Sequence, residues 1–274
     1  MEKINSIIYG KMSEVPKESL SWGKVGKLFS NWGELKINGY LIEFIESVEY
    51  SKWADIKSEN LCLVEDGEAT LLFNNKEYCV RKGYVFKIYP NQNVKILLKS
   101  RLLLTSIQMI TNLEFFNGED LNELKLINPD DVPVKVYEYE SLGQEIITCK
   151  YEPGIGLLKF TFPINKIPIH KHPFSGRLIR PISGKGFSYV DPHKYEMNEG
   201  TFILFPKGTI HTNGPLPGDV FTLWAVQLPW IDSKIDEENI AGTEEFVRYI
   251  ESTPPKELWK TKQDFLRVID KLSK

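Results

Sequence analysis

The chain has 274 residues, of which 42% are hydrophobic and 26% are charged, and its formal net charge is −3. This length is enough for one large domain or two ordinary ones, each with its own core. Acidic and basic residues are interleaved along most of the chain, so it lacks the basic footprint of a nucleic-acid-binding protein and the polybasic cluster of a membrane anchor.

The N-terminal segment lacks the apolar stretch of a signal peptide. The sequence contains no run of 18 apolar residues, so no membrane-spanning helix is expected. The three cysteines, Cys62, Cys79 and Cys149, are scattered and form no CxxC motif. A disulfide framework is therefore not expected, and a cytoplasmic protein is the interpretation that fits. We assign no chemistry to these thiols.

Short strand-like segments, rich in β-branched and aromatic residues, follow one another from about residue 35 to residue 230. Turn residues separate them at the spacing expected of a β-sandwich or barrel. The clearest segments are EATLLF (68–73), KEYCV (76–80), YVFKIY (84–89), VKILL (94–98), LLLTSIQMI (102–110), GLLKFTF (156–162), GTFILF (200–205) and FTLWAVQL (221–228). The polar, proline-containing stretch 117–133 interrupts this pattern and is the predicted linker.

The C-terminal region has a different pattern. Segments 243–252 and 256–274 have apolar residues at helical spacing, and Pro254 and Pro255 separate the two. We expect a short helical tail that packs onto a barrel or onto a second subunit. The two segments carry no concentrated basic face, so they do not resemble a helix-turn-helix DNA reader.

An internal repeat predicts two similar domains. Gly67 and Gly83 are 16 positions apart, as are Gly184 and Gly200, and the same offset of 117 residues relates both members of the two pairs. The surrounding sequences also match: each shows strand, glycine turn, strand, polar turn, strand, glycine turn and strand, followed by proline. A repeat of this kind changes the expected fold from one domain to two copies of one unit.

All four histidines lie in the second repeat: His170, His172, His193 and His211. In the strand-like context IPIHKHPF, the two-residue period of a strand places His170 and His172 on one face. His211 follows the turn PKGTI, so a neighbouring antiparallel strand can supply it as a third ligand. We expect these three imidazoles to bind a metal ion, and we interpret His193, which follows Pro192, as a solvated turn residue.

The two segments that carry these histidines, 170–186 and 200–213, resemble the two motifs of the cupin superfamily. The matching positions are His170, His172, Gly184, Gly200, Pro206, Gly208, His211 and Asn213. The resemblance implies an all-β fold of two double-stranded β-helix (jelly-roll) barrels, a bicupin, with the metal in the second barrel. The expected ranges are a degenerate N-terminal barrel (1–116), the linker (117–133), the metal-binding barrel (134–232) and the helical tail (233–274).

One position departs from the family motif: Arg177 stands where the motif has a glutamate ligand. One interpretation is a three-histidine site with open coordination positions, as the resemblance to thiol and diketone-cleaving dioxygenases implies. Another is that the guanidinium of Arg177 has replaced the metal and binds a carboxylate or phosphate. A third interpretation combines the two: the metal holds one end of an anionic substrate and Arg177 pairs with its charge, which would make Arg177 both a substrate-binding and a catalytic residue.

The first repeat serves as an internal comparison. Subtracting 117 places Trp53, Asp55, Asn60 and Val94 opposite His170, His172, Arg177 and His211. None of these four is a histidine, so we expect the first barrel to keep the fold and to lack the metal site.

Further candidates lie on strands expected to line or flank the second barrel. Tyr189, Trp224 and Gln227 are the predicted substrate-binding residues, with core packing as the alternative for each. Asp191, Glu196 and Glu199 are expected in a solvated turn, although one of them can replace the missing carboxylate ligand. We interpret Asn213 as a brace for the turn after His211.

Three imidazoles suit a divalent transition metal: Fe(II), Zn(II), Ni(II), Cu(II) or Mn(II). We favour Fe(II), and with it a dioxygenase-like oxidoreductase acting on a small anionic metabolite, because the motif glutamate is absent. A sugar or sugar-acid isomerase, epimerase or lyase with a Lewis-acid metal is the second hypothesis. A non-catalytic small-ligand sensor is the third. The expected partner is a small-molecule substrate, with no nucleic acid and no membrane, and analogy with the family adds a homodimer.

Overall fold

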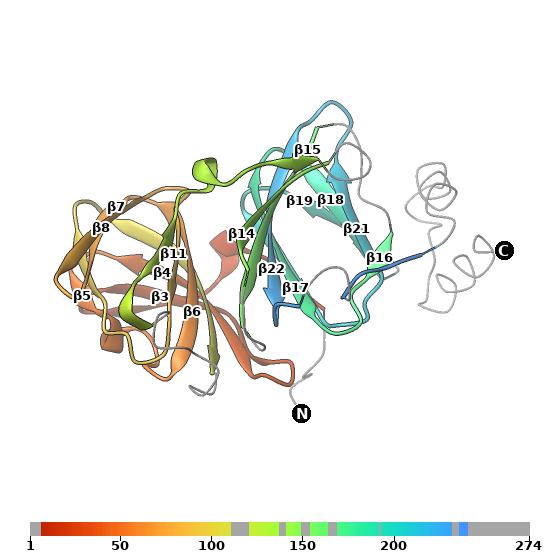
Figure 1. The fold of residues 1–274 in the computed structure, drawn as a ribbon. Coiled ribbons are helices and arrows are strands. Elements are labelled where there is room, and N and C mark those ends of the chain that lie inside the picture. Colours follow the sequence, from red (N-terminus) through yellow and green to blue (C-terminus); the bar gives the residue numbers. More distant parts are fainter. Residues whose placement is uncertain are drawn as a thin grey trace.

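The computed structural model describes residues 7–110, 121–136, 141–148, 154–163, 169–191, 193–231 and 236–240. Its elements are almost all strands, joined by turns and by the short 3₁₀ turns η1 (Met12–Glu14), η2 (Tyr50–Lys52) and η4 (Pro129–Asp131). The predicted all-β fold is confirmed. Figure 1 shows two strand-rich units side by side, each built from two facing sheets.

The first unit contains a seven-stranded and a four-stranded sheet, and all its pairings are antiparallel. The larger sheet has the order β12 (Lys125–Ile127), β9 (Val85–Ile88), β6 (Ser58–Asp66), β11 (Leu102–Ile110), β4 (Ile37–Phe44), β3 (Gly23–Trp32) and β2 (Lys17–Leu20). The smaller one has the order β5 (Val48–Glu49), β10 (Lys95–Leu98), β7 (Glu68–Phe73) and β8 (Lys76–Arg81).

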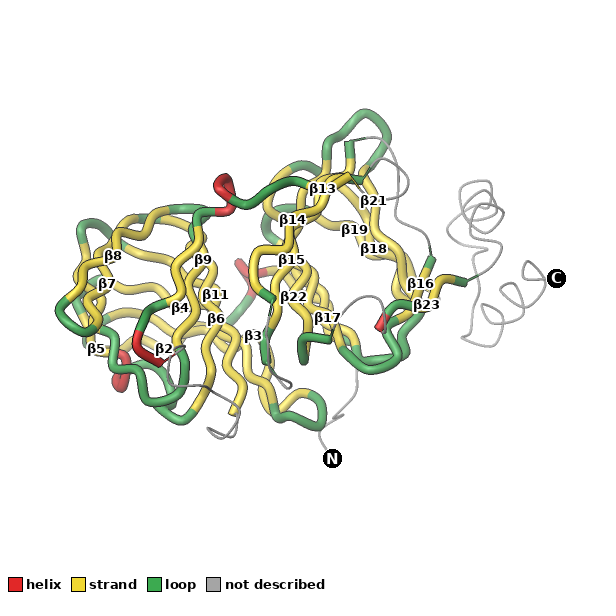
Figure 2. Tube along the Cα trace, viewed as in Figure 1, coloured by secondary structure: helices red, strands yellow, loops and turns green. Residues whose placement is uncertain are grey.

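The second unit repeats this arrangement with a seven-stranded and a five-stranded sheet. The larger sheet has the order β1 (Ile8–Lys11), β20 (Thr201–Phe205), β17 (Gly176–Ser183), β22 (Phe221–Leu228), β15 (Gly156–Phe162), β14 (Leu142–Ile147) and β13 (Lys135–Val136). The smaller one has the order β19 (His193–Met197), β18 (Gly186–Val190), β21 (His211–Pro215), β16 (His170–Lys171) and β23 (Glu238–Asn239). The tube in Figure 2 shows the open ring of strands in this unit.

The strand pairing carries the repeat that the sequence predicts. Asn60 of β6 pairs with Ile88 of β9, and Arg177 of β17 pairs with Phe205 of β20. Asn60 and Arg177 are 117 positions apart, and so are their partners Ile88 and Phe205. Asn60 is therefore the structural counterpart of Arg177. Between β11 and β22 the offset between the repeats is two residues larger. Asn60 lies opposite Gln108 of β11, whereas Arg177 lies opposite Gln227 of β22, so Gln108 and Gln227 are counterparts.

The two barrels exchange one strand each, which the sequence analysis did not predict. β1, at the N-terminus, pairs with β20 of the second barrel, whereas β12 pairs with β9 of the first barrel. These pairings are also related by 117 residues: Ile8 lies opposite Leu204, and Lys125 lies opposite Lys87. Each repeat therefore begins with a strand that completes the sheet of the other.

This exchange corrects two details of the expected organisation. The described part of the predicted linker 117–133 contains β12 and η4, which correspond to β1 and η1 at the start of the first repeat. Residues 8–11, assigned to the first barrel, lie in a sheet of the second. Polar residues and prolines suggested a linker there because an edge strand with one solvated face shows little of the apolar pattern of an inner strand.

Side chains of the larger sheets alternate between the barrel interior and the space between the barrels. On β22, Phe221, Leu223 and Ala225 pack inside the second barrel, whereas Trp224 and Val226 belong to a cluster shared with the first barrel. The first barrel has its own interior core around Phe44, Phe86 and Ile96. The molecule thus has one core in each barrel and a third between them, as expected for two layered sheets that pack together.

Buried charges also join the two barrels. Glu59 on β6 and Lys87 on β9 form an ion pair, and both side chains are buried. Glu59 accepts the backbone N–H of Ile155 at 3.0 Å and Lys87 donates to the carbonyl of Ile155 at 3.0 Å. Because Ile155 immediately precedes β15, the pair of the first barrel holds the start of a strand in the second.

The predicted helical segments 243–252 and 256–274 lie outside the described residues. Within the part of the chain that the structure describes, no helix is long and apolar enough to cross a membrane. Residues 238–239, which fall in the range predicted as a helical tail, form β23 beside β16. The described part of this range therefore includes a strand that pairs with β16, which carries the candidate ligand His170.

Candidate metal centre

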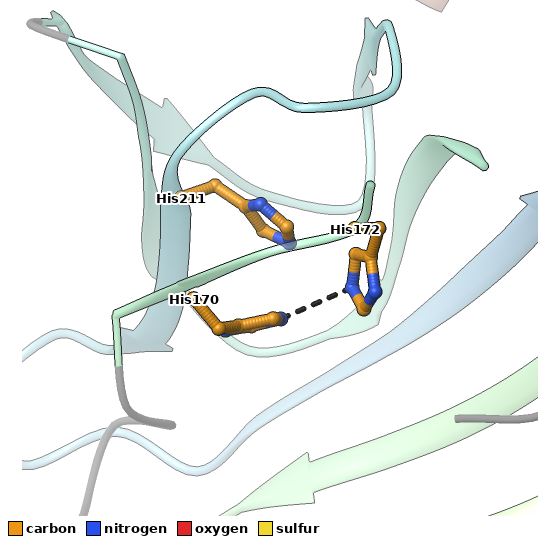
Figure 3. Close-up of side chains that lie close together, drawn as sticks. All are labelled: His170, His172 and His211. Atoms are coloured by element: carbon orange, nitrogen blue, oxygen red, sulfur yellow. Dashed lines mark hydrogen bonds between the residues drawn. The ribbon is translucent and has the colours of Figure 1, made fainter. Parts of the chain in front are cut away.

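The three candidate ligands come from two adjacent strands of the smaller sheet of the second barrel. His170 begins β16 and His172 follows that strand directly, so the two-residue period turns both side chains to one face. His211 begins β21 and lies directly opposite His170 in the antiparallel register. Figure 3 shows the three rings turned toward one another.

The three imidazoles are close enough to share one ion. Their candidate ligand atoms all lie within 4.8 Å of one another, and the Nε2 atoms of His170 and His172 are 3.1 Å apart. Metal–nitrogen bonds of about 2.0–2.1 Å place two ligands of one ion roughly 3–4 Å apart, so the donor set fits a transition metal. All three side chains are buried, with exposed fractions of 5%, 7% and 3% for His170, His172 and His211.

Backbone carbonyls fix the tautomer of two of these rings. Nδ1 of His172 is 2.7 Å from the carbonyl oxygen of Asp236, and Nδ1 of His211 is 3.0 Å from that of Thr209. A carbonyl oxygen only accepts, so Nδ1 carries the proton in both rings. Nε2 of each ring then carries no proton, which is the state that a metal ligand needs, and in His172 this atom lies within hydrogen-bonding distance, 3.1 Å, of Nε2 of His170.

Burial keeps these rings uncharged. The pKa of His172 lies well below its ordinary value, chiefly because of burial and then because of the nearby positive charge of Arg177. The pKa of His211 is also lowered, again mainly by burial. Neutral imidazoles are therefore available to a cation across the whole ordinary pH range.

Arg177, at the position of the motif glutamate, lies on β17 with its side chain 2% exposed. Nη2 donates to Oδ2 of Asp236 at 3.2 Å, and Nη1 donates to the carbonyl of Gly176 at 3.1 Å and to the hydroxyl of Ser175. Burial lowers the pKa of Arg177 to about 10, against the opposing effect of Asp236, so the side chain stays charged at neutral pH. Its charge is thus paired within the protein.

Asp236 is the residue that sequence reasoning missed. Its side chain is fully buried, and Oδ1 accepts the backbone N–H groups of Phe174 and Ser175 at 2.9 and 3.2 Å. The residue belongs to no motif, and it lies in the polar stretch IDSKIDEEN beyond the expected end of the second barrel. No sequence signal distinguishes it from the other acids of this stretch.

Gln227, predicted as a substrate-binding residue, lies beside Arg177 in the larger sheet of the second barrel. It pairs with Arg177 across β22 and β17, and opposite residues of an antiparallel pair share one face. The side chain is 1% exposed, and its Oε1 atom has no hydrogen-bond partner among the described residues. A buried acceptor of this kind calls for an explanation, and a ligand group is one.

The other two predicted substrate-binding residues point elsewhere. Trp224 packs in the cluster between the barrels, on the face of β22 opposite to Gln227. Tyr189 on β18 contacts Phe187 and Lys194, whereas its neighbour Val190 points into the barrel core. Because successive side chains of a strand point to opposite faces, both residues point away from the histidines. Their positions therefore favour a role in packing.

The acids considered as replacement ligands do not join the three histidines. Within the described residues, the group that can share a metal ion contains no carboxylate. Glu196 and Glu199 are exposed, and so is His193. Asn213 is buried, and its side-chain oxygen accepts the hydroxyl of Ser188 on the neighbouring strand.

The equivalent positions of the first barrel hold no histidine. Val94 is fully buried in an apolar core, Trp53 packs edge-on against Phe44, and Asn60 accepts the hydroxyl of Ser106. Trp53, Val94 and Asn60 thus contribute apolar packing and a neutral hydrogen bond, whereas Asp55, the counterpart of His172, is exposed and accepts the backbone N–H of Lys57.

Comparison with known proteins places the fold. No family model matches the sequence, and no curated protein matches it. Among solved structures, protein Ylba from E. coli has a TM-score of 0.67 at 10% identity, covering 83% of this chain and 93% of that one. A cupin 2 conserved barrel domain protein from Leptotrichia buccalis has a TM-score of 0.59 at 14% identity, covering 81% and 96%.

Oxalate decarboxylase from Lactobacillus farciminis, solved as a formate complex, has a TM-score of 0.65 at 9% identity, covering 95% of this chain and 96% of that chain. At such low identity the likeness concerns the fold alone. The comparison therefore shows the fold, two β-barrels of the cupin type over a length close to that of oxalate decarboxylase. The three-histidine group lies in the second of these barrels.

Proposed function

We propose that the protein is a metal-dependent cupin enzyme that acts on a small anionic metabolite in its second barrel. The observation that carries this proposal is the convergence of His170, His172 and His211, all buried and two of them with Nδ1 held by a carbonyl. Oxalate decarboxylase shares the fold. The Lactobacillus farciminis enzyme was solved in complex with formate, and the Bacillus subtilis enzyme contains Mn(II) centres. Both ligand classes agree with this proposal.

The residues around the histidines define what the barrel does with a substrate. Three ligands on one side of an ion leave positions open for a chelating substrate, which the ion polarises or, if redox-active, exposes to O₂. Gln227 offers a buried hydrogen-bond acceptor to a hydroxyl or amine of the substrate. The Arg177 guanidinium adds a positive charge within the barrel, and the carboxylate of Asp236 is its ion-pair partner at 3.2 Å.

Two reaction types fit this centre. A dioxygenase-like oxidoreductase with Fe(II) is our first choice, because no carboxylate joins the three histidines in the described residues. A lyase or isomerase with a Lewis-acid ion such as Mn(II) is the second, and the extent of the structural likeness to oxalate decarboxylase favours it. The two differ in one measurable way, since only the first consumes O₂.

The test begins with elemental analysis of protein purified without oxygen. We expect about one divalent transition-metal ion per chain in the wild type and in His193→Ala, an exposed histidine that serves as the matched control. His172→Ala is expected to lose most of the metal. Equal metal content in His172→Ala and wild type, or none in either, would exclude the proposed centre.

The metal-loaded protein is then assayed on small thiols, diketones, sugar acids and oxalate. Uptake of O₂ coupled to substrate loss identifies the oxidoreductase. Release of CO₂ or isomerisation of the substrate without net O₂ uptake identifies the second reaction type. A stable protein that binds ligands tightly without any metal would instead be a small-ligand sensor, and the enzyme proposal would be abandoned.

A further inference from the structure

The segment 236–240 lies against the metal ligands as an added strand. β23 pairs with β16 so that Asn239 lies opposite His170 and Glu238 lies opposite Lys171. The N–H of Ile240 donates to the carbonyl of Ile169 at 3.0 Å. β16 has only two residues, so β23 supports it on one side while β21 pairs with it on the other.

Asp236, at the start of this segment, contacts both a metal ligand and Arg177. Its backbone carbonyl accepts the Nδ1–H of His172 at 2.7 Å. Its carboxylate accepts the N–H groups of Phe174 and Ser175, the Ser175 hydroxyl and the guanidinium of Arg177. One residue therefore joins a metal ligand, the turn after it and the cation that replaces the motif glutamate.

The charge of Arg177 makes this arrangement necessary. A guanidinium that is 2% exposed and shares the carboxylate of Asp236 with the ligand His172, whose Nδ1 lies 3.7 Å from Oδ2, would repel a divalent cation if it stood alone. The carboxylate of Asp236 offsets that charge, because Nη2 and Oδ2 are 3.2 Å apart and both side chains are buried. Removing one partner of such a pair leaves an uncompensated charge in a dry site.

We propose that Asp236 is a positioning residue of the metal centre: by neutralising Arg177 and orienting His172, it couples docking of segment 236–240 to metal binding. The pair of Arg177 and Asp236 thus stands in for the motif glutamate without touching the ion. This inference rests on the metal-binding part of the proposed function. It adds that the ligand set is complete only when a segment from beyond the second barrel is in place.

The first test measures the affinity for Mn(II) and Zn(II) by competition with a chelator. D236N keeps the size of the side chain and removes its charge, and we expect it to bind about 10- to 100-fold more weakly than the wild type, the usual cost of losing such a support. E238Q is the matched control, because it removes the surface ion pair with Lys171 from the same segment. Its affinity is expected to stay within twofold of the wild type.

A double variant separates charge compensation from simple loss of structure. In R177Q/D236N neither charge remains, so we expect it to bind metal at least threefold more tightly than D236N alone. A purely structural role would make the double variant weaker than the single one, and that result would overturn the proposal.

Docking is tested without metal by hydrogen exchange. We expect R177Q to speed exchange of the amides of Phe174, Ser175 and Ile240 more than tenfold, and E238Q to leave the first two unchanged. This measurement decides the matter even where D236N does not fold. The positioning role is contradicted if D236N binds metal within twofold of the wild type, or if hydrogen exchange is unchanged in R177Q. Neither result affects the proposed metal centre. If the wild type binds no metal, both the metal centre and the positioning role are contradicted.

Discussion

At the scale of single residues, the second barrel concentrates groups that its core does not need. Three buried histidines, the buried pair of Arg177 and Asp236, and Gln227, whose Oε1 has no hydrogen-bond partner among the described residues, lie on or next to β16, β17, β21 and β22. Burying such groups costs free energy, and the first barrel shows that the same fold forms without the histidines. Their presence in one barrel only is what indicates a function.

The buried histidines predict how stability of the metal-free protein depends on pH. The pKa values of His172 and His211 are lowered in the folded state, whereas in the unfolded state they return to about 6.5. Below that pH the unfolded state binds more protons, so the free energy of unfolding falls by up to about 1.4 kcal/mol per pH unit for each group. Urea unfolding between about pH 7.5 and 5.5 measures this slope.

The variant His211→Gln serves as a check on that slope. It removes one of the two groups, so the pH dependence is expected to become shallower. Stability that does not change between these pH values in the metal-free wild type would show that the rings take up protons in the folded protein.

Replacing Gln227 by an apolar residue is expected to increase stability and to decrease activity. The buried Oε1 of Gln227 has no hydrogen-bond partner in the part of the chain that the structure describes, so Gln227→Leu is expected to raise the free energy of unfolding of the free protein by about 1 kcal/mol, while substrate turnover falls. Gln108, its counterpart in the first barrel, donates to Ser106 at 3.5 Å and serves as the control. Gln108→Leu is expected to lower stability, and the opposite order of the two variants in thermal unfolding would refute the argument.

At the scale of elements, matching turns build the two repeats. Gly67 has a φ of +89° and Gly184 a φ of +74°, a region that favours glycine. A β-carbon at Gly67 would collide with the carbonyl of Arg101, and one at Gly184 with the carbonyl of Val220. Each glycine therefore permits the same close approach of two chain segments in its own barrel, which explains why the pair stands out in the sequence.

This close approach predicts unequal effects of two alanine substitutions. Gly218 also has a positive φ, +85°, but a β-carbon there would meet nothing within 4 Å. Gly218→Ala is expected to cost about 1–2 kcal/mol, the strain of the backbone alone. Gly184→Ala adds the collision with Val220 and is expected to cost about 2–4 kcal/mol. Chemical denaturation measures the loss of unfolding free energy in both variants. Equal losses would show that the backbone near Val220 moves away from the added β-carbon at little cost.

At the scale of the whole molecule, the barrels are one cooperative structure. They exchange β1 and β12, share an apolar cluster that contains Trp32, and hold one another through the pair of Glu59 and Lys87. Trp32, on β3 of the first barrel, packs over Gly176 of β17, one residue before Arg177. The degenerate barrel thus supports the back of the sheet whose front carries the site.

The ion pair between the barrels gives a prediction at this scale. Lys87→Met leaves the carboxylate of Glu59 buried without its cation, and we expect it to lower the free energy of unfolding by about 3–5 kcal/mol. The double variant Lys87→Met/Glu59→Gln removes both charges and keeps an acceptor for the N–H of Ile155, so it is expected to lose less than the single variant. A double variant at least as unstable as the single one would mean that the hydrogen bonds to Ile155, and not the charges, matter.

Local sequence patterns predicted most of the strands. EATLLF, GLLKFTF and FTLWAVQL coincide with β7, β15 and β22, because their β-branched and aromatic residues suit the pleated, buried or half-buried surface of a strand. The N-terminal strands β1–β3 lie before the region predicted as strand-like, and β12 lies within the predicted linker. Edge and exchanged strands have one solvated face or lie far from their partners, so their composition alone did not reveal them.

The sequence by itself determined the repeat, the two-barrel fold and the three histidines, because each depends on a period of two residues or on a spacing that is fixed along the chain. Only the tertiary structure decided which side of its strand each further candidate faces, turning Gln227 toward the site and Trp224 and Tyr189 away from it. It also supplied Asp236, which reaches His172 from 64 residues further along the chain. A contact of that kind depends on how strands pack in space, and no local pattern of residues encodes it.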